Sequence, residues 1–179
     1  MADWKIAFDW MMAFEDAHRL CRAIPDAAPQ GHSEPCFAIS GINSAVFPRE
    51  YALIAALPEA ERAAAVRQFY ERHFWNPWFA RLASDELCKR VFDFAINAGA
   101  GTAVRLLQKA ANGLRRSYAE PVAEDGVWGE KTLAVVNAAN ADALVAAFKA
   151  HRADFYRSIA AASPAKQKYL KGWLERASR

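Results

Sequence analysis

The sequence has few cysteines and no long apolar run. Its 179 residues include three cysteines, none of which forms a Cys-x-x-Cys pair. This spacing indicates neither a zinc site nor a disulfide framework, although a single Cys21–Cys36 bridge stays open. No stretch approaches eighteen uninterrupted apolar residues, as a typical transmembrane helix would require. We therefore expect no metal, no cofactor and no stable membrane insertion.

The sequence also has little excess charge and no leader segment. Residues 1–5 (MADWK) do not begin a basic segment followed by an apolar run. Twenty-three Lys and Arg against twenty Asp and Glu give a net charge of +3. Because no helix carries a basic stripe, nucleic acid is not an expected partner. We expect a protein made in the cytoplasm without a signal peptide.

A strong helical pattern, centred on residues 90–108, organises the chain. Apolar residues there recur at helical spacing: Phe92, Ala95, Ile96, Gly99, Ala103, Leu106 and Leu107. The first half is apolar on its other side as well, which predicts a buried helix. Gly99 and Gly101 indicate a break or a close contact after it. With no repeat and no strong strand pattern elsewhere, the sequence predicts an all-α fold around this central helix, with C-terminal helices at about 141–162 and 164–176 packed on it.

Two polar residues, Asp93 and Asn97, interrupt the central helix. They are four residues apart, so on a helix they lie one turn from each other on the same side. Buried polar groups need hydrogen-bonding partners or a function. The pair either ties a neighbouring segment to the helix or lines a cleft.

A first helix is predicted from Trp4 to about Arg22, with Asp3 as its cap. Glu15 lies four residues after Met11, on the apolar stripe of this helix. Burial disfavours the charged form of a carboxylate, which would suit an acid catalyst. The alternative is a surface glutamate paired with Arg19 at the next turn.

Residues 24–48 differ in composition from the rest, with four prolines and two glycines among polar side chains. This pattern predicts a long loop or a short irregular hairpin. Long ordered loops in compact domains are often functional, and this one follows the Glu15 helix. The alternative is a surface loop without a catalytic or binding role. A helix from Pro58 to Asn76 then carries a cluster of aromatic residues that serves either as core or as a platform for sugar rings.

Several motifs in order along the chain resemble glycoside hydrolase family 108, the N-acetylmuramidases also called secretion-activator proteins. They are residues 74–77 (FWNP), 91–99 (VFDFAINAG), 103–108 (AVRLLQ), 125–133 (DGVWGEKTL) and 169–176 (YLKGWLER). The resemblance implies an all-α, lysozyme-like muramidase region at 1–113. It also implies a helical peptidoglycan-binding region at 114–179 that belongs to the same compact unit.

The resemblance also implies site residues. Glu15 occupies the place of the family's catalytic acid, although the two glycines that follow that acid in the family are absent here and the next loop is longer. One alignment places Asp26 and Ser33 at the family's aspartate and threonine. The other, counted back from the Gly41-Ile42-Asn43 match, places Ser33 or Glu34 at the aspartate and Ala38 at the threonine. Asn43, Trp75, Asp93 and Asn97 are the candidate substrate-binding residues.

The implied activity is that of an endolysin-type lysozyme. Glu15 would protonate the oxygen of the β-1,4 bond between N-acetylmuramic acid and N-acetylglucosamine, while Asp26, Ser33 or Asn43 would place the water. Peptidoglycan is then the partner, reached at the cell wall or periplasm through a holin-type pore, a secretion machine or host lysis. The alternative is a non-catalytic peptidoglycan-binding or secretion-accessory protein derived from such an enzyme.

Overall fold

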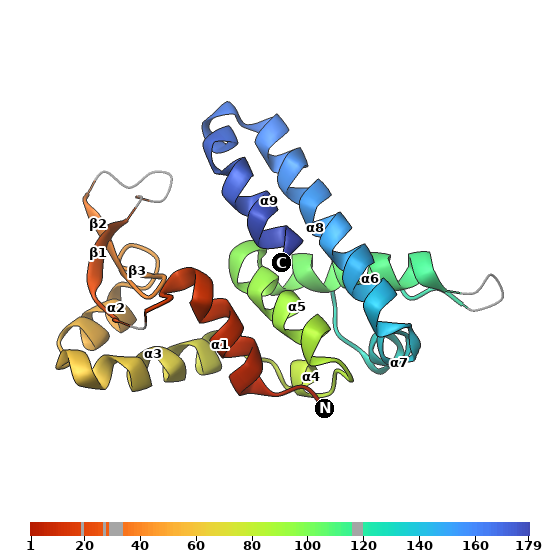
Figure 1. Ribbon diagram of the computed structural model, residues 1–179, viewed down its shortest axis with the longest axis horizontal. Coiled ribbons are helices and arrows are strands. Elements are labelled where there is room, and N and C mark those ends of the chain that lie inside the picture. The colour runs from red at the N-terminus through yellow and green to blue at the C-terminus, as the bar shows by residue number, and fades with distance from the viewer. Residues whose placement is uncertain (19, 27, 29–33, 116–119) are drawn as a thin grey trace. The chain divides into compact units, whose positions relative to one another are not determined.

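The computed structural model spans residues 1–179 and describes residues 1–18, 20–26, 28, 34–115 and 120–179 (Figure 1). The described chain is mostly helical, which confirms the predicted all-α class. It divides into two compact units. We call residues Trp4–Trp75 the N-terminal unit, and residues Met1–Asp3 with Asn76–Arg179 the C-terminal unit. The predicted boundary between 113 and 114 stays a prediction.

The N-terminal unit combines three helices with a small sheet. Its elements are α1 (Trp4–Glu15), β1 (Ala23–Asp26), β2 (Cys36–Ile39), β3 (Ile42–Asn43), α2 (Pro48–Ala55) and α3 (Glu59–Phe74). The strands pair antiparallel in the order β1-β2-β3, with Asp26 opposite Cys36 and Ala38 opposite Asn43. The predicted hairpin is therefore present, and a third strand extends it. The sequence shows no strong strand pattern here because strands of two to four residues are too short for an alternation of apolar and polar residues to be recognised.

The first helix is shorter than predicted. It buries Ala7, Phe8, Met11 and Met12, and it ends at Glu15 instead of continuing to Arg22. The alternative pair of Glu15 with Arg19 lies outside the described residues. Aromatic rings from α3 form much of the core of this unit, since Phe69 and Tyr70 are buried and the Tyr70 ring lies 6.1 Å from that of Phe8.

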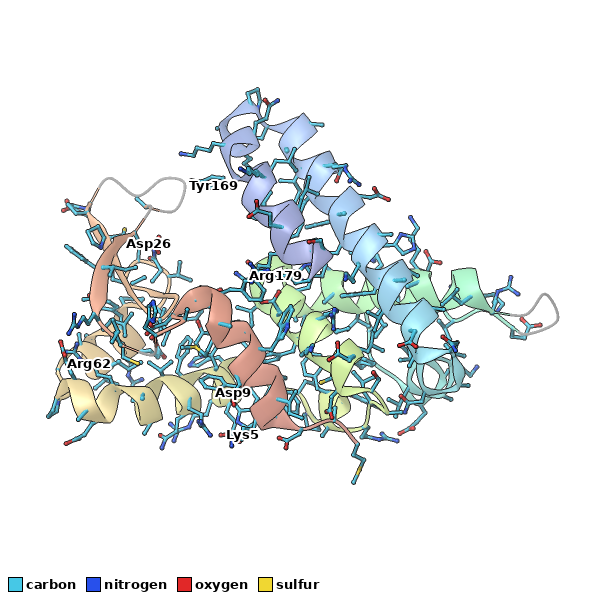
Figure 2. All side chains as sticks on the ribbon, in the orientation of Figure 1. Lys5, Asp9, Asp26, Arg62, Tyr169 and Arg179 are labelled. Carbon is cyan, nitrogen blue, oxygen red and sulfur yellow. The ribbon has the colours of Figure 1, made fainter. Side chains whose placement is uncertain are left out.

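Arg62, on the first turn of α3, connects three parts of the N-terminal unit (Figure 2). Its guanidinium donates hydrogen bonds to the backbone oxygens of Leu57 at 3.0 Å, Ala55 at 2.8 Å and Cys21 at 3.3 Å. These bonds tie the α2–α3 connection to the segment that precedes β1. Cys21 and Cys36 are both buried free thiols, so the Cys21–Cys36 disulfide that the sequence left undecided is not formed.

The C-terminal unit is helical throughout its described elements. They are α4 (Pro77–Ala80), α5 (Asp85–Ala98), α6 (Ala100–Leu114), α7 (Glu130–Ala138), α8 (Ala141–Ala162), the 3₁₀ helix η1 (Pro164–Tyr169) and α9 (Leu170–Ser178). The predicted buried central helix is α5, and the predicted break is at Gly99 (φ 87°), which lies between α5 and α6. In Figure 1, α8 and α9 run side by side, and α8 also packs on α6.

Aromatic rings and one turn hold the C-terminal unit together. Phe94 of α5 is fully buried and makes edge contacts with Phe148 and Tyr156 of α8 at 6.0 and 5.7 Å between ring centroids. The turn at Gly126 packs on α6 so closely that a Cβ there would lie 2.5 Å from the carbonyl oxygen of Gly101. Gly126 also has a φ of 79°, which favours glycine. Gly126 therefore allows the turn to approach the backbone of α6 this closely.

No single helix among the described residues is long and apolar enough to cross a membrane, although α7 and α8 together, bent by 114°, meet the length and composition requirement.

Candidate functional site

Glu15 is placed by the packing of α1. The four buried apolar residues of this helix fix its rotation, and Glu15 is its last residue and is half-buried. Its carboxylate therefore stands at a helix end and faces the turn between β2 and β3.

Gly41 brings the backbone of that turn directly against the carboxylate. A Cβ atom at Gly41 would lie 2.5 Å from Glu15 Oε2 and 2.7 Å from the Tyr70 hydroxyl. Real Cβ contacts are almost never this short, so only glycine fits here without a shift. The hydroxyl of Tyr70 also donates a 2.8 Å hydrogen bond to the carbonyl oxygen of Ser40. Glu15, Tyr70 and the turn thus form one cluster, which we call the Glu15 cluster.

Asp16 closes the same end of α1. Its carboxylate accepts hydrogen bonds from the backbone N–H of Leu20 at 3.1 Å and of Cys21 at 2.8 Å, and from Ser40 Oγ at 2.8 Å. Cys21 and Ser40 both have a φ of 48°, an uncommon conformation for residues with a side chain. Three hydrogen bonds engage this carboxylate, so Asp16 holds the backbone on both sides of the Glu15 cluster instead of transferring protons.

Asp26 lies on the same sheet, at the far end of β1 (Figure 2). It is exposed and accepts a 2.7 Å hydrogen bond from Asn43 Nδ2. Gly41 and Asn43 are two residues apart, hence at most about 7 Å along the chain. Glu15 thus contacts the turn before β3 at Gly41, and Asp26 is hydrogen-bonded to Asn43 at the end of β3.

Asn43 has a structural role in this sheet. The residue is only 8% exposed, and its Oδ1 accepts hydrogen bonds from the backbone N–H of Ala45 at 2.8 Å and of Val46 at 3.3 Å. Its side chain thus orients Asp26 and shapes the chain after β3. The predicted contact of Asn43 with substrate stays a prediction.

Of the other predicted residues in this unit, Ser33 lies outside the described residues. Trp75 is half-buried at the end of α3 and its ring lies 5.2 Å from that of Trp4; a sugar contact there stays a prediction. Ala38 pairs with Asn43 in the sheet, and Glu34 is exposed ahead of β2. The first alignment thus places a carboxylate on this sheet, at Asp26, whereas the second places Ser33 or Glu34 at the family's aspartate, ahead of β2.

We expect Gly41→Ala to reduce the activity of the Glu15 cluster more than its stability. Alanine at a φ of +82° costs about 1–2 kcal/mol, and its Cβ must displace the Glu15 carboxylate or the Tyr70 hydroxyl. Thermal unfolding and cell-wall hydrolysis should be measured together. Gly113→Ala is the matched control, because a Cβ at Gly113 meets nothing within 4 Å. Equal activity of the two variants would exclude a catalytic role for the cluster.

Asp93 in the C-terminal unit requires a correction. Its carboxylate is fully buried and is bound by Arg152 at 2.6 Å and by Arg176 at 2.5 Å. A sugar cannot reach it, so the first of the two alternatives holds: Asp93 ties α8 and α9 to α5. Asn97 donates a 2.9 Å hydrogen bond to the backbone oxygen of Asp93 and is exposed.

Asn97 does line a pocket. This pocket has a volume of about 340 Å³ and lies among α5, α8, η1 and α9, with Tyr156, Lys166, Tyr169 and Trp173 in its wall. The Tyr156 and Trp173 rings stack at 5.2 Å. We call it the aromatic pocket. The predicted substrate-binding role of Asn97 thus stays a prediction, at a site in the C-terminal unit.

Metal and thiol chemistry have little support among the described residues. No group of three or more His, Cys, Asp or Glu side chains there could hold a metal ion. Burial raises the pKa of the Cys88 thiol to about 12, with a smaller contribution from Asp85. This thiol is therefore neutral near pH 7 and a poor nucleophile.

Sequence reasoning identified Glu15 and Asp26 but missed Tyr70, Gly41 and Asp16 as parts of the site. Tyr70 was grouped with the aromatic core, although a buried tyrosine usually needs a partner for its hydroxyl. Gly41 followed by Ile42 was recognised only as a motif match. No local signal could show that residues 15, 41 and 70 meet.

Comparison with known proteins relates the chain to peptidoglycan. Residues 102–178 match the family model described as "Predicted Peptidoglycan domain". No curated protein matches the chain significantly. Among solved structures, "Structure of Brucella abortus SagA" aligns with a TM-score of 0.65 and 23% sequence identity, over 97% of this chain and 88% of that one. The chain thus shares its fold with SagA over nearly its whole length, and its C-terminal part is similar to a peptidoglycan domain.

Proposed function

We propose that this protein is a peptidoglycan hydrolase, a lysozyme-like N-acetylmuramidase with Glu15 as general acid. The observation that carries the proposal is the packing of the Glu15 carboxylate against Gly41 and Tyr70. Gly41 is in a turn of the same sheet whose first strand carries Asp26. Two carboxylates on either side of a scissile bond are what glycoside hydrolysis requires. The peptidoglycan-domain match at residues 102–178 supports the choice of polymer.

In the proposed mechanism, the Glu15 carboxyl gives a proton to the glycosidic oxygen as the bond to the anomeric carbon breaks. The Asp26 carboxylate, oriented by Asn43, stabilises the positive charge on the sugar ring or removes a proton from the attacking water. Tyr70 and Gly41 fix the position of the proton donor. Binding of the polymer by the C-terminal unit would keep the site on its substrate. The protein would act at the cell wall, after passage through a holin-type pore, a secretion machine or host lysis.

A second function, peptidoglycan binding without cleavage, is favoured by a specific observation. In the alignment counted back from Gly41, the family's threonine is replaced by Ala38, which is buried in β2 opposite Asn43 and has no hydroxyl. The glycines after Glu15 are absent as well. A protein with this function would adsorb to cell walls through residues 102–178 and act as an accessory factor.

Purified sacculi distinguish the two functions. We expect the wild-type protein to clear a suspension of sacculi and to release new reducing ends in the same tubes. Adsorption to pelleted sacculi without new reducing ends would establish the accessory function instead. If the folded protein neither clears nor pellets with sacculi, both functions are wrong.

A further inference from the structure

A second pocket of the C-terminal unit carries charges of both signs. It has a volume of about 470 Å³ and lies between α6 and α8, within the segment that matches the peptidoglycan domain. We call it the charged pocket. Its charged lining residues are Arg105, Lys109, Glu124 and Asp154, and the titratable His151 lies among them. Its size falls in the range of small-ligand sites.

The charged side chains of this pocket are partly fixed in place. Arg105 donates hydrogen bonds from Nε to the backbone oxygen of Glu124 at 3.1 Å and from Nη2 to that of Asp125 at 3.2 Å. Glu124 in turn accepts a 3.0 Å hydrogen bond from Asn112 Nδ2. These contacts hold Arg105 and Glu124 in the pocket wall. Because the wall presents groups of both signs, the pocket is suited to a ligand that carries both charges.

The charged and aromatic pockets are adjacent. Both are lined by Phe155, a half-buried residue of α8, so a single ligand can extend from one to the other across this ring. Tyr169 lies at the end of η1, on the rim of the aromatic pocket (Figure 2). Aromatic rings with a neighbouring amide suit a sugar. The charged pocket does not, because in peptidoglycan that carries stem peptides the lactyl carboxyl of N-acetylmuramic acid is part of an amide bond, which leaves the glycan uncharged.

We propose that the charged pocket binds the stem peptide of peptidoglycan, while the aromatic pocket takes the sugar next to it. This inference rests on the proposed function for the choice of polymer. The charges of peptidoglycan are on its stem peptide, as free carboxylates and as the side-chain amine of its diamino acid. Lys109, Arg105 and His151 would take a carboxylate, and Asp154 and Glu124 would take the amine.

His151 provides a separate readout. Burial lowers its pKa, as does Lys109, whereas Asp154 and Glu124 act in the opposite direction. The imidazole is therefore neutral at pH 7, and a carboxylate bound beside it would favour its protonated form. Binding of the peptide should tighten as the pH falls from 8 towards 6, and His151→Gln should remove this dependence.

The test is calorimetric titration of the full-length protein with the N-acetylated tripeptide Ala-γ-Glu-diaminopimelate. Lys109→Gln should weaken binding by about tenfold or more, because a charge-assisted contact is lost. Lys131→Gln removes the same charge from an exposed position of α7 and should leave the affinity unchanged. Asp154→Asn should lower the affinity for this tripeptide, but not the affinity for a tripeptide whose side-chain amine is acetylated.

A chitin tetrasaccharide is the peptide-free comparison. If Lys109→Gln lowers the affinity for the tetrasaccharide as much as the affinity for the tripeptide, the charged pocket binds glycan and the inference is wrong. If wild-type protein clears or pellets with sacculi but does not bind the tripeptide, the inference fails and the proposed function stands. If the tripeptide binds but sacculi are neither cleaved nor adsorbed, the site is a peptide site and the proposed function fails.

Discussion

Replacing Asp93 with alanine should destabilise the protein by about 3–5 kcal/mol, the range measured when one partner of a buried ion pair is removed. Arg152 is only 1% exposed, and its guanidinium relies on the Asp93 carboxylate at 2.6 Å. Its other contacts are weaker, namely a 3.4 Å hydrogen bond to the Tyr156 hydroxyl and the face of the Phe94 ring at 5.2 Å. Without Asp93, a positive charge stays buried with no counter-ion.

The loss extends to α9. Arg176 binds both oxygens of Asp93, so the alanine variant also releases the contact that ties α9 to α5. Thermal unfolding should shift by roughly 6–20 °C for a chain of this size. Asp142→Ala, at an exposed position in the first turn of α8, is the control and should change stability by no more than about 1 kcal/mol.

A double variant separates charge burial from packing. Arg152→Met in the Asp93→Ala background removes the unpaired charge and retains an apolar chain beside Phe94 and Tyr156. It should recover a large part of the lost stability, because a buried ion pair can be replaced by apolar groups with little net change. Equal stability of the Asp93→Ala and Asp142→Ala variants would show that this ion pair does not hold the unit together.

Glu15→Gln should lower the rate of sacculus cleavage by at least about 10²-fold while the fold stays intact. Glutamine has the same shape as glutamate and fits against Gly41 and Tyr70, but its amide cannot protonate the leaving oxygen. Reducing ends measure the chemistry, and pelleting with sacculi measures binding, which should be unchanged. A Glu15→Gln variant that cleaves at the wild-type rate would remove Glu15 from the mechanism.

The second carboxylate can be identified in the same assay. Asp26→Asn should reduce cleavage strongly if the first alignment of the loop is correct, since Asn43 orients that side chain. Glu34→Gln should then have little effect, because that alignment gives Glu34 no role and the residue precedes β2. The reverse result would favour the alignment that places Glu34 at the family's aspartate and Ala38 at its threonine.

The sequence by itself determined the all-α class of this protein and its central helix. The apolar spacing around Phe92 predicted a buried central helix, and Gly99 predicted its end, because both effects are local and repeat within a few residues. The helix predicted at about 141–162 is present as α8 with the same bounds. Glu15 was also found this way, since its spacing from Met11 places both on one helix face.

Only the tertiary structure decided what the polar groups do. Asp93 was predicted either to pair or to line a cleft, and it pairs because Arg152 and Arg176, 59 and 83 residues away, fold onto it. Glu15 meets Gly41 and Tyr70 for the same kind of reason, since the pairing of short strands and the packing of α3 bring them together. Helix spacing is encoded locally, whereas the partner of a buried charge depends on long-range packing that no single segment of the chain contains.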